Sequence, residues 1–590
     1  MFLRLLSVSC RTGADGRQSG VLKAALVSVL LLTGLITTGF AEQNQKTEPG
    51  LFEYTGTYQL RRIDPNLTGS GIRFAVISRS MTYVDGYPQN DYRPHTDHQS
   101  FDGSNVTFHD DGRLSSGVSA HCTAVLSILI GDDANASYPE LGRFYYEGAA
   151  PDSQVDVYEF WHFAANNIYS ALSPGADIIT MSIGWQFEDW WTRGLESIAE
   201  HSGTLVIAGI GNGTNAYDSV LYPGACSNVL GVGVVSAAES NNVELTLRHF
   251  GLSSPANTSC GPTDNRRAKP DIVAPGNCLV ADTNSFDRYR ITGSWSSFAT
   301  PVVAGTAALL LQKTKSEPDL DEAIGTGYRN CLIRTVLMNS AVKLPYWHKG
   351  QVSPADDHSV PLDYAQGAGV LNAVGAYEQL VAGRMEPGRV RARGWDKNCL
   401  DEEKNPQNIY SFSVNQEDHN GFLCTTLVWN RHFQQQYPFA STGEDDDLRL
   451  ELWAVDINQP ENDILLDYSD SNTDNLEHIY FALDPNYTDY EIVVSFGSAA
   501  DANYTEKSEC YVLAWNIARQ SAYEQILWYD FNFDGIVDDA DFSIILENVV
   551  DAMNGSDDYL LGDINLDGRI DLQDMEIVIS AKALKAQWYQ

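Results

Sequence analysis

Short apolar runs alternate with longer amphipathic stretches between residues 60 and 380. The stretches at 121–130, 187–202 and 301–314 repeat apolar residues at the spacing of a helix. The runs between them are rich in β-branched residues, which is typical of strands buried on both faces. They read IRFAVIS (72–78), VDVYEFW (155–161), ADIITMSIG (176–184), TLVIAGIGN (204–212) and NVLGVGVVS (228–236). This alternation predicts an α/β domain over 60–382, with a doubly wound, mostly parallel sheet.

The pattern changes to short alternating strands over residues 385–520. Asn, Asp, Gly and Pro interrupt these strands, as they do in antiparallel sheets joined by turns. The strands read NIYSFSV (408–414), LRLELWAVD (448–456), HIYFALD (478–484), YEIVVSFG (490–497) and CYVLAWNI (510–517). We therefore expect an all-β sandwich domain over 385–520.

The N-terminus predicts export from the cell. Arg4, Arg11, Arg17 and Lys23 precede the apolar run AALVSVLLLTGLITTGFA, which ends in a small-x-small cleavage pattern. Residues 1–41 are therefore interpreted as a secretory signal peptide and 42–59 as a linker. An uncleaved membrane anchor is the alternative, and no other apolar stretch is long enough to cross a bilayer. The predicted localisation is secreted, extracellular or on the cell surface, with no membrane association after cleavage.

The composition narrows the possible partners. The chain has 38 Lys and Arg against 78 Asp and Glu, a formal net charge of −40, which excludes nucleic acid as a partner. Nine cysteines are present, and eight remain after removal of the signal peptide. An even number in a secreted chain permits disulfides, but their connectivity stays open.

The last segment of the chain carries a duplicated acidic motif, DFNFDGIVDDAD (530–541) and DINLDGRIDLQD (563–574). Each copy places oxygen-bearing side chains at loop positions 1, 3, 5, 9 and 12, and a glycine at position 6, which is the arrangement that Ca²⁺ requires. An ordinary acidic surface loop is the alternative. The predicted ligands, with backbone carbonyls at position 7, are Asp530, Asn532, Asp534, Ile536, Asp538 and Asp541, then Asp563, Asn565, Asp567, Arg569, Asp571 and Asp574.

This repeat resembles type I dockerin over about residues 527–586, and we assign residues 527–590 to a dockerin-like domain. The resemblance implies a small α-helical module that holds two Ca²⁺ ions and binds a cohesin domain, usually through a Ser/Thr pair at loop positions 10 and 11. Here those positions hold Asp539 and Ala540, then Leu572 and Gln573. The partner of the module is therefore left open between a cohesin-like protein and another part of this chain.

Three segments carry candidate chemistry in the α/β domain. Ser297 in GSWSSFATPVVAGTAALLL (293–311) begins an apolar helix, where N–H groups and the helix dipole favour negative charge. His121 in GVSAHCTAVLSILIG (117–131) also begins a helix, and Asn212 ends the strand TLVIAGIGN. Taken singly, these residues read as a helix cap, a structural histidine and a turn.

Together they resemble the subtilisin-like serine proteases, the subtilases, in sequence and in order. KPDIVAPG (269–276), GAAPDSQVDVYEF (148–160) and MSIG (181–184) extend the resemblance over residues 60–380. The resemblance implies protein or peptide substrates, Ser297 as nucleophile and His121 as general base. It also implies an oxyanion hole from Asn212 and the Ser297 N–H, and a substrate-binding strand edge at Ser182, Ile183 and Gly184.

The segment that departs from the family is the first strand, FAVISRSM, where subtilases carry the triad aspartate. Its position falls on Ser78 or Arg79, and the next carboxylates along the chain are Asp85 and Asp97. We take Asp85 as the candidate acid, with Asp97 as the weaker alternative. A secreted serine endopeptidase and a catalytically impaired peptide-binding protein with the same fold both remain possible. A scaffold for surface attachment is a third possibility.

Two further departures surround the expected active site. Cys122 replaces the glycine that usually follows the histidine, and in a packed helix start we expect its thiol to be buried and unpaired. Trp295 replaces a glycine two residues before Ser297, where an indole could crowd the nucleophile or cap a pocket.

The strands of 385–520 resemble the jelly-roll or pre-peptidase C-terminal domains that follow secreted bacterial proteases, although an unrelated sandwich is also possible.

Overall fold

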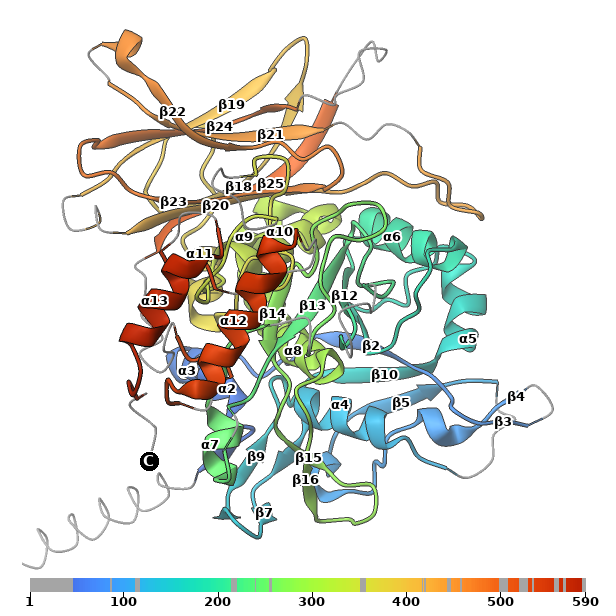
Figure 1. Cartoon of the computed structure of the whole chain (residues 1–590). Coiled ribbons are helices and arrows are strands. Elements are labelled where there is room, and N and C mark those ends of the chain that lie inside the picture. Colours follow the sequence, from blue (N-terminus) through green and yellow to red (C-terminus); the bar gives the residue numbers. More distant parts are fainter. Residues whose placement is uncertain are drawn as a thin grey trace, which may run out of the picture. The chain divides into compact units, whose positions relative to one another are not determined.

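The computed structural model divides the chain into two units, Met1–Lys46 and Thr47–Gln590, and the second holds all the elements below (Figure 1). No helix within its described part is long and apolar enough to cross a membrane. The predicted signal peptide lies outside the described residues. The structure describes residues 46–585 except 85–86, 112–116, 214–219, 239, 254–256, 351–356, 416–417, 419–420, 443–446, 457–458, 498–507, 519–528, 533–534, 556–561 and 566–568.

A seven-stranded sheet forms the centre of the α/β domain, in the order β14-β13-β12-β11-β2-β10-β5. All neighbours in it run parallel, which confirms the predicted sheet type. The chain winds outward from β2 in both directions, so the ends of β2, β11 and β12 meet along one edge. The strands are β2 (Arg73–Ser78), β5 (Val106–His109), β10 (Gln154–Glu159), β11 (Ile178–Met181), β12 (Leu205–Gly209), β13 (Val229–Val235) and β14 (Ile272–Pro275).

Helices cover both faces of this sheet, as the alternation of patterns predicts. Phe74 and Val76 of β2 pack in one core with α4 (Ala120–Ile130), α8 (Ser296–Ser316), α10 (Arg329–Asn339) and α11 (Ala373–Val381). Ala75 and Ile77 pack in a second core with α6 (Trp190–Ser202) on the other face. The two-residue alternation along β2 therefore divides its side chains between the two helical layers.

Part of the range expected as a linker has regular structure. Thr47–Glu48 (β1) and Leu51–Tyr54 (α2) lie in it, Thr57–Ile63 (α3) begins in it, and Leu51, Phe52 and Tyr58 are buried. Apolar residues too widely separated to give a periodic signal thus join the main core through tertiary contacts.

Two further sheets follow within residues 385–520 and share one apolar core. The disulfide Cys399–Cys510 joins β18 to β25, and α10 contacts both β20 and β25. One sheet holds β17 (Gly388–Arg389), β19 (Gln407–Ser413), β24 (Asp489–Phe496), β21 (Leu448–Ala454) and β22 (Ile464–Ser469). The other holds β18 (Gly394–Asp401), β25 (Ser508–Ala518), β20 (Phe422–Trp429) and β23 (Leu476–Ala482).

The chain ends in two helices, α12 (Asp539–Met553) and α13 (Leu572–Ser580), which follow the two acidic motifs. The remaining described helices are α5 (Phe160–Phe163), α7 (Val243–Arg248), α9 (Pro318–Ile324) and the short helices η1 (Asn90–Tyr92), η2 (Gln99–Phe101), η3 (Ala164–Ile168), η4 (Thr326–Tyr328) and η5 (Pro460–Asn462). The remaining strands are β3 (Tyr83–Val84), β4 (Tyr87–Pro88), β6 (Asp132–Asp133), β7 (Ser137–Tyr138), β8 (Gly142–Arg143), β9 (Tyr145–Glu147), β15 (Leu279–Ala281) and β16 (Tyr289–Ile291).

Candidate active site

Ser297 lies in the first turn of α8 and is joined to the end of β11 by two hydrogen bonds. Its hydroxyl donates to the Ser182 carbonyl oxygen at 3.3 Å, and the Ser182 hydroxyl donates to the Ser297 carbonyl oxygen at 2.7 Å. Trp185 and Tyr222 exchange backbone hydrogen bonds, which holds the segment after Ser182 extended. The structure thus brings Ser297 against the predicted substrate-binding edge.

Asn212 follows β12 after Gly211, whose φ of +110° is a conformation that favours glycine. The Ser296 N–H donates to the Asn212 side-chain oxygen Oδ1 at 2.6 Å, and the Ser296 hydroxyl donates to the same atom at 3.0 Å. A backbone N–H can only donate, so the amide orientation is fixed with Oδ1 toward Ser296. The Nδ2 donor of Asn212 is therefore turned away from Ser296.

His121 is the second residue of α4, and the preceding Ser119 caps that helix by accepting from the Cys122 N–H at 3.0 Å. The imidazole lies beside Phe298, the neighbour of Ser297, with 5.8 Å between ring centroids. Burial, and to a lesser extent the cation of Arg290, lowers the pKa of His121 to about 4. The ring is therefore neutral at pH 7, which is the form that a general base needs.

The position expected for the triad acid falls on Ser78, the last residue of β2, or on Arg79, which follows it. Ser78 is buried, and it lowers the pKa of the Cys122 thiol against the larger opposite effect of burial. Cys122 is buried and not in a disulfide, as predicted, and burial raises its pKa to about 12. Asp85, the candidate acid, lies outside the described residues, and Asp97 is exposed.

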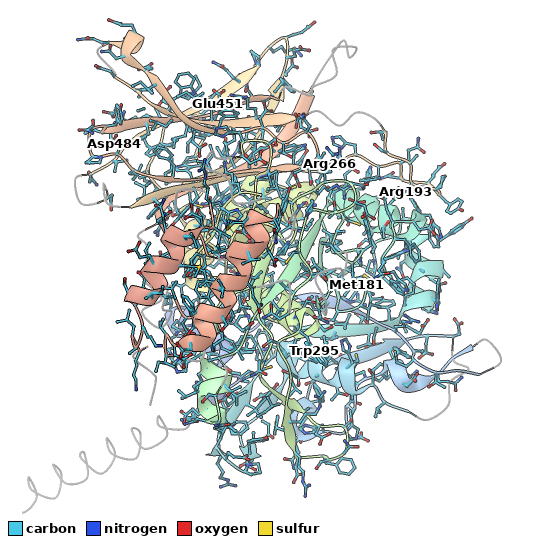
Figure 2. The ribbon with its side chains drawn as sticks, viewed as in Figure 1. Met181, Arg193, Arg266, Trp295, Glu451 and Asp484 are labelled. Carbon is cyan, nitrogen blue, oxygen red and sulfur yellow. A yellow bond between two sulfur atoms is a disulfide. The ribbon has the colours of Figure 1, made fainter. Side chains whose placement is uncertain are left out.

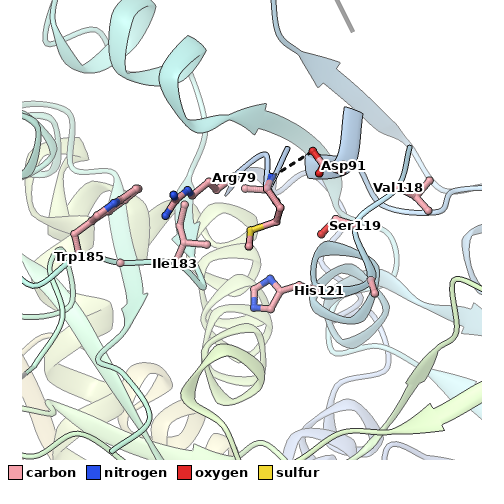
Figure 3. A pocket seen from close by; sticks show the side chains of 11 residues that line it. Arg79, Asp91, Val118, Ser119, His121, Ile183 and Trp185 are labelled. Carbon is pink, nitrogen blue, oxygen red and sulfur yellow. Dashed lines mark hydrogen bonds between the residues drawn. The ribbon is translucent and has the colours of Figure 1, made fainter. Parts of the chain in front are cut away.

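A cavity of about 560 Å³ opens beside His121 and is lined by Ser78, Arg79 and the segment Ile183–Trp185. In Figure 3, Trp185, Ile183 and Arg79 enter from the left, Asp91, Val118 and Ser119 from the right, and His121 lies below them. The Arg79 guanidinium lies over the Trp185 ring in a cation–π contact, with its carbon 5.6 Å from the ring centroid. Sequence reasoning missed Asp91 and Trp185, because only the tertiary fold places them near His121.

Trp295 immediately precedes α8, and its side chain is 52% exposed (Figure 2). The indole stacks on Phe298, with 5.9 Å between ring centroids and an interplanar angle of 15°. Phe298 therefore contacts both the indole and the imidazole of His121. The tryptophan covers the start of α8 on the same side as the candidate base.

The two acidic motifs form turns before α12 and α13. Asp541 is buried and accepts the backbone N–H groups of Phe531 and Asp538, at 2.7 and 2.8 Å. Asp574 does the same for Ile564 and Asp571 in the second copy, at 2.8 and 2.9 Å. The last acid of each motif therefore closes its loop around the first residues.

The described part of the first loop turns sharply at its glycine. Gly535 at the sixth position has a φ of +89°, and its N–H donates to the Asp530 carboxylate at 2.8 Å, which gives the sharp turn that the loop needs. A group of three or more His, Cys, Asp or Glu side chains placed to hold a metal is not found within the described residues. Those residues leave out Asp534 and Asp567, the predicted ligands at the fifth position of each loop.

Comparison with known proteins agrees with the arrangement around Ser297. The model of the Subtilase family, Peptidase_S8, matches residues 38–419, which is more than half of the chain. The chain belongs to the subtilase family. This match bears out the predicted resemblance and includes Ser78, His121, Asn212 and Ser297.

Individual subtilases are distant relatives of this chain. Thermitase from Thermoactinomyces vulgaris is 25% identical over 33% of this chain and 58% of its own length. Serine protease AprX from Bacillus subtilis is 26% identical over 43% of this chain and 59% of its own. The chain thus spans about three-fifths of these first curated relatives. A solved structure of the self-cleaved protease domain of PatA is 25% identical, covers 54% of this chain and 100% of its own, and has a TM-score of 0.36.

Proposed function

We propose that this subtilase is a serine endopeptidase that hydrolyses peptide bonds through an acyl-enzyme. The observation that carries the proposal is the orientation of Asn212. Two donors from Ser296 hold its Oδ1, so its Nδ2 is available as a donor near the start of α8. A fixed amide donor beside a serine at a helix N-terminus is what acyl transfer requires at the developing oxyanion.

In the proposed mechanism, a peptide pairs with the edge at Ser182, Ile183 and Gly184. The Ser297 hydroxyl attacks the scissile carbonyl carbon while His121 takes its proton. The Asn212 Nδ2 and the Ser297 N–H donate to the oxyanion. His121 then gives the proton to the leaving amine, and water hydrolyses the acyl-enzyme by the same steps.

A peptide-binding protein with residual or no hydrolysis is the second candidate function. Ser78 at the end of β2 favours it, because a buried hydroxyl cannot replace a carboxylate as the group that holds the imidazolium. Asp85 is the candidate acid within this chain, and Asp85→Asn tests it. Loss of cleavage by orders of magnitude would assign the acid to Asp85, whereas retained cleavage would mean that the acid comes from elsewhere.

Labelling with a fluorophosphonate probe separates the two functions. The wild-type chain is expected to be labelled at Ser297, and Ser297→Ala to lose both labelling and casein cleavage. Ser316→Ala is the matched control, because Ser316 is exposed at the other end of the same helix. Absence of labelling and cleavage in the wild type, together with peptide binding, would establish the binding protein.

We further propose that the C-terminal module binds two Ca²⁺ ions through the ligands predicted above. The closed turns at Asp541 and Asp574 and the conformation of Gly535 support this. The Phe531 ring stacks on Tyr346 of the α/β domain, 5.8 Å between centroids, which favours an intramolecular partner over a cohesin-like one. Calcium titration by calorimetry is expected to give two sites, and Asp541→Asn to remove one.

The proposal includes export of the chain and a supporting role for the two sheets of 385–520. The apolar run before residue 41 and the cleavage pattern support export. N-terminal sequencing of protein from the culture medium is expected to begin at Glu42.

The shared core of the two sheets supports a domain of the kind that follows secreted bacterial proteases.

A further inference from the structure

The side chains of His121 and Arg79 line the same cavity, and each can donate a hydrogen bond to an acceptor there. Neither ring nitrogen of His121 has a hydrogen-bond partner within the described part of the chain. Arg79 is exposed, and it forms no ion pair with any described residue. An imidazole N–H and a guanidinium are both donors, and one carboxylate can accept from both.

Among the described residues that line this cavity, the only acidic side chain is that of Asp91. Asp91, on η1, uses one carboxylate oxygen to accept the Met81 N–H at 3.3 Å. The other titratable groups near His121 in the described part of the chain are Arg290 on β16, Arg79 after β2 and the Cys122 thiol on α4. Within that part, burial and then the charge of Arg290 lower the pKa of His121.

We propose that the peptide substrate supplies the missing carboxylate: an Asp or Glu side chain enters the cavity, pairs with Arg79 and accepts a hydrogen bond from the His121 ring. This inference rests on the proposed peptidase function. It names the substrate class as peptides with an acidic residue at one position near the scissile bond. The cavity of about 560 Å³ is lined by Ile183 and Gly184, the edge on which the peptide would lie.

The geometry of Arg79 suits this role. Its guanidinium carbon lies 5.6 Å from the centroid of the Trp185 ring, a cation–π contact. Such a contact uses none of the N–H donors of the guanidinium, so they are available to the fork that matches a carboxylate. Trp185 therefore holds Arg79 in place without consuming its hydrogen bonds.

The substrate carboxylate would act as a positioning group and would not exchange a proton. It would hold the His121 ring with one nitrogen toward itself and the other toward Ser297. The proton of the Ser297 hydroxyl still passes to His121 and then to the leaving amine. The carboxylate stays ionised and stabilises the imidazolium formed between these steps.

The test uses pairs of fluorogenic peptides that differ only by Glu or Gln, at each position on the N-terminal side of the scissile bond. At one position the Glu peptide is expected to have a kcat about tenfold higher or more, the effect of a hydrogen bond to a charged group. Arg79→Gln should remove this difference. Arg62→Gln, which removes an exposed arginine on α3, is the matched control and should retain it.

Ser78→Asp provides the complementary variant, because it places a carboxylate at the end of β2. In Ser78→Asp, kcat for the Gln peptide is expected to rise toward kcat for the Glu peptide, so the preference for Glu becomes smaller. Ser78→Asn is the matched neutral variant, and it should leave kcat for the Gln peptide no higher than in the wild type. A purely structural effect at Ser78 would change both peptides equally in both variants.

Several outcomes would overturn the inference without touching the proposed function. One is equal kcat for the Glu and Gln peptides at every position, in a chain whose Ser297 is labelled by fluorophosphonate. A Glu preference confined to KM would likewise show that Arg79 binds the acid but that the acid does not assist His121. Loss of all cleavage in Asp85→Asn, with no Glu preference in the wild type, would assign the carboxylate to this chain. Failure of labelling in the wild type would instead refute the peptidase itself.

Discussion

Removing the Asn212 side chain tests the oxyanion hole directly. Asn212→Ala deletes the Nδ2 donor, and loss of one such donor costs about 2.7–4 kcal/mol of transition-state stabilisation, or about 10²–10³ in kcat. Because the donor acts on the oxyanion and not on the bound carbonyl, KM should change little. The assay is steady-state cleavage of a fluorogenic peptide, with thermal unfolding as a check that the fold is intact.

The hydrogen bonds of Ser296 supply a graded second variant. Ser296→Ala removes the hydroxyl that bridges the Gly211 N–H at 3.2 Å and the Asn212 Oδ1 at 3.0 Å, but it keeps the backbone N–H that donates to Oδ1. A neutral hydrogen bond contributes about 0.5–1.5 kcal/mol, so kcat should fall by only about two- to twelvefold.

The two variants together decide whether the orientation of Asn212 matters. Asn212→Asp keeps an acceptor for Ser296 but places a negative charge where the oxyanion forms, so its kcat should be below that of Asn212→Ala. Ser316→Ala at the far end of α8 is the control. An unchanged kcat in Asn212→Ala, or an equal loss in Ser296→Ala and Asn212→Ala, would refute the assignment.

Four further measurements follow from the structure. Because the pKa of His121 is lowered to about 4, kcat/KM for a peptide without acidic residues should stay level from pH 7 to about 5 and halve near pH 4. A fall in kcat/KM to half its value near pH 6.5, the usual pKa of histidine, would contradict this. Asp271→Asn leaves the buried ammonium of Lys269, now 2.6 Å from Asp271, without its counter-charge, so denaturant titration should show a loss of about 3–5 kcal/mol in the free energy of unfolding. Burial raises the pKa of Asp474 from 3.8 to about 6, so between these pH values the folded state keeps a proton that the unfolded state releases. The free energy of unfolding of the wild type, relative to that of Asp474→Asn, should therefore be highest below pH 4 and should fall by about 3 kcal/mol as the pH rises through 6. Chelation of Ca²⁺ should lower the unfolding temperature of the C-terminal module, since each site at 100 times its Kd adds about 2.7 kcal/mol, and a melting curve unchanged by chelator would contradict bound calcium.

The sequence alone determined five of the seven strands of the central sheet and the helices α4, α6 and α8. The β-branched runs are buried on both faces, and the helical stretches are long enough to be distinguished from strands, so each pattern has a single favourable local structure. The run IRFAVIS became β2 (Arg73–Ser78), and the stretch 121–130 became α4 (Ala120–Ile130). The segments around Ser297, His121 and Asn212 identified the family, because their residue types are tied to backbone positions at strand and helix ends.

Other elements had no such local signal. The strands β5 and β14 and the helix α10 were not predicted, α2 lies in the range assigned to a linker, and α3 begins there. These segments are short or lack a clear period, and their apolar residues are stabilised only by the core that they join. Propensity within a short window cannot report contacts with residues far away in the chain.

The tertiary structure decided the surroundings of the candidate base. Asp91, Trp185 and Arg290 come from three separate elements, and no spacing in the sequence relates them to His121. The sequence showed that the usual acid is missing at Ser78 or Arg79, since the family carries it at the end of this strand. Only the fold showed that Arg79 lies over Trp185, beside an imidazole that has no hydrogen-bond partner among the described residues, because those positions depend on how β2, α4 and the end of β11 meet.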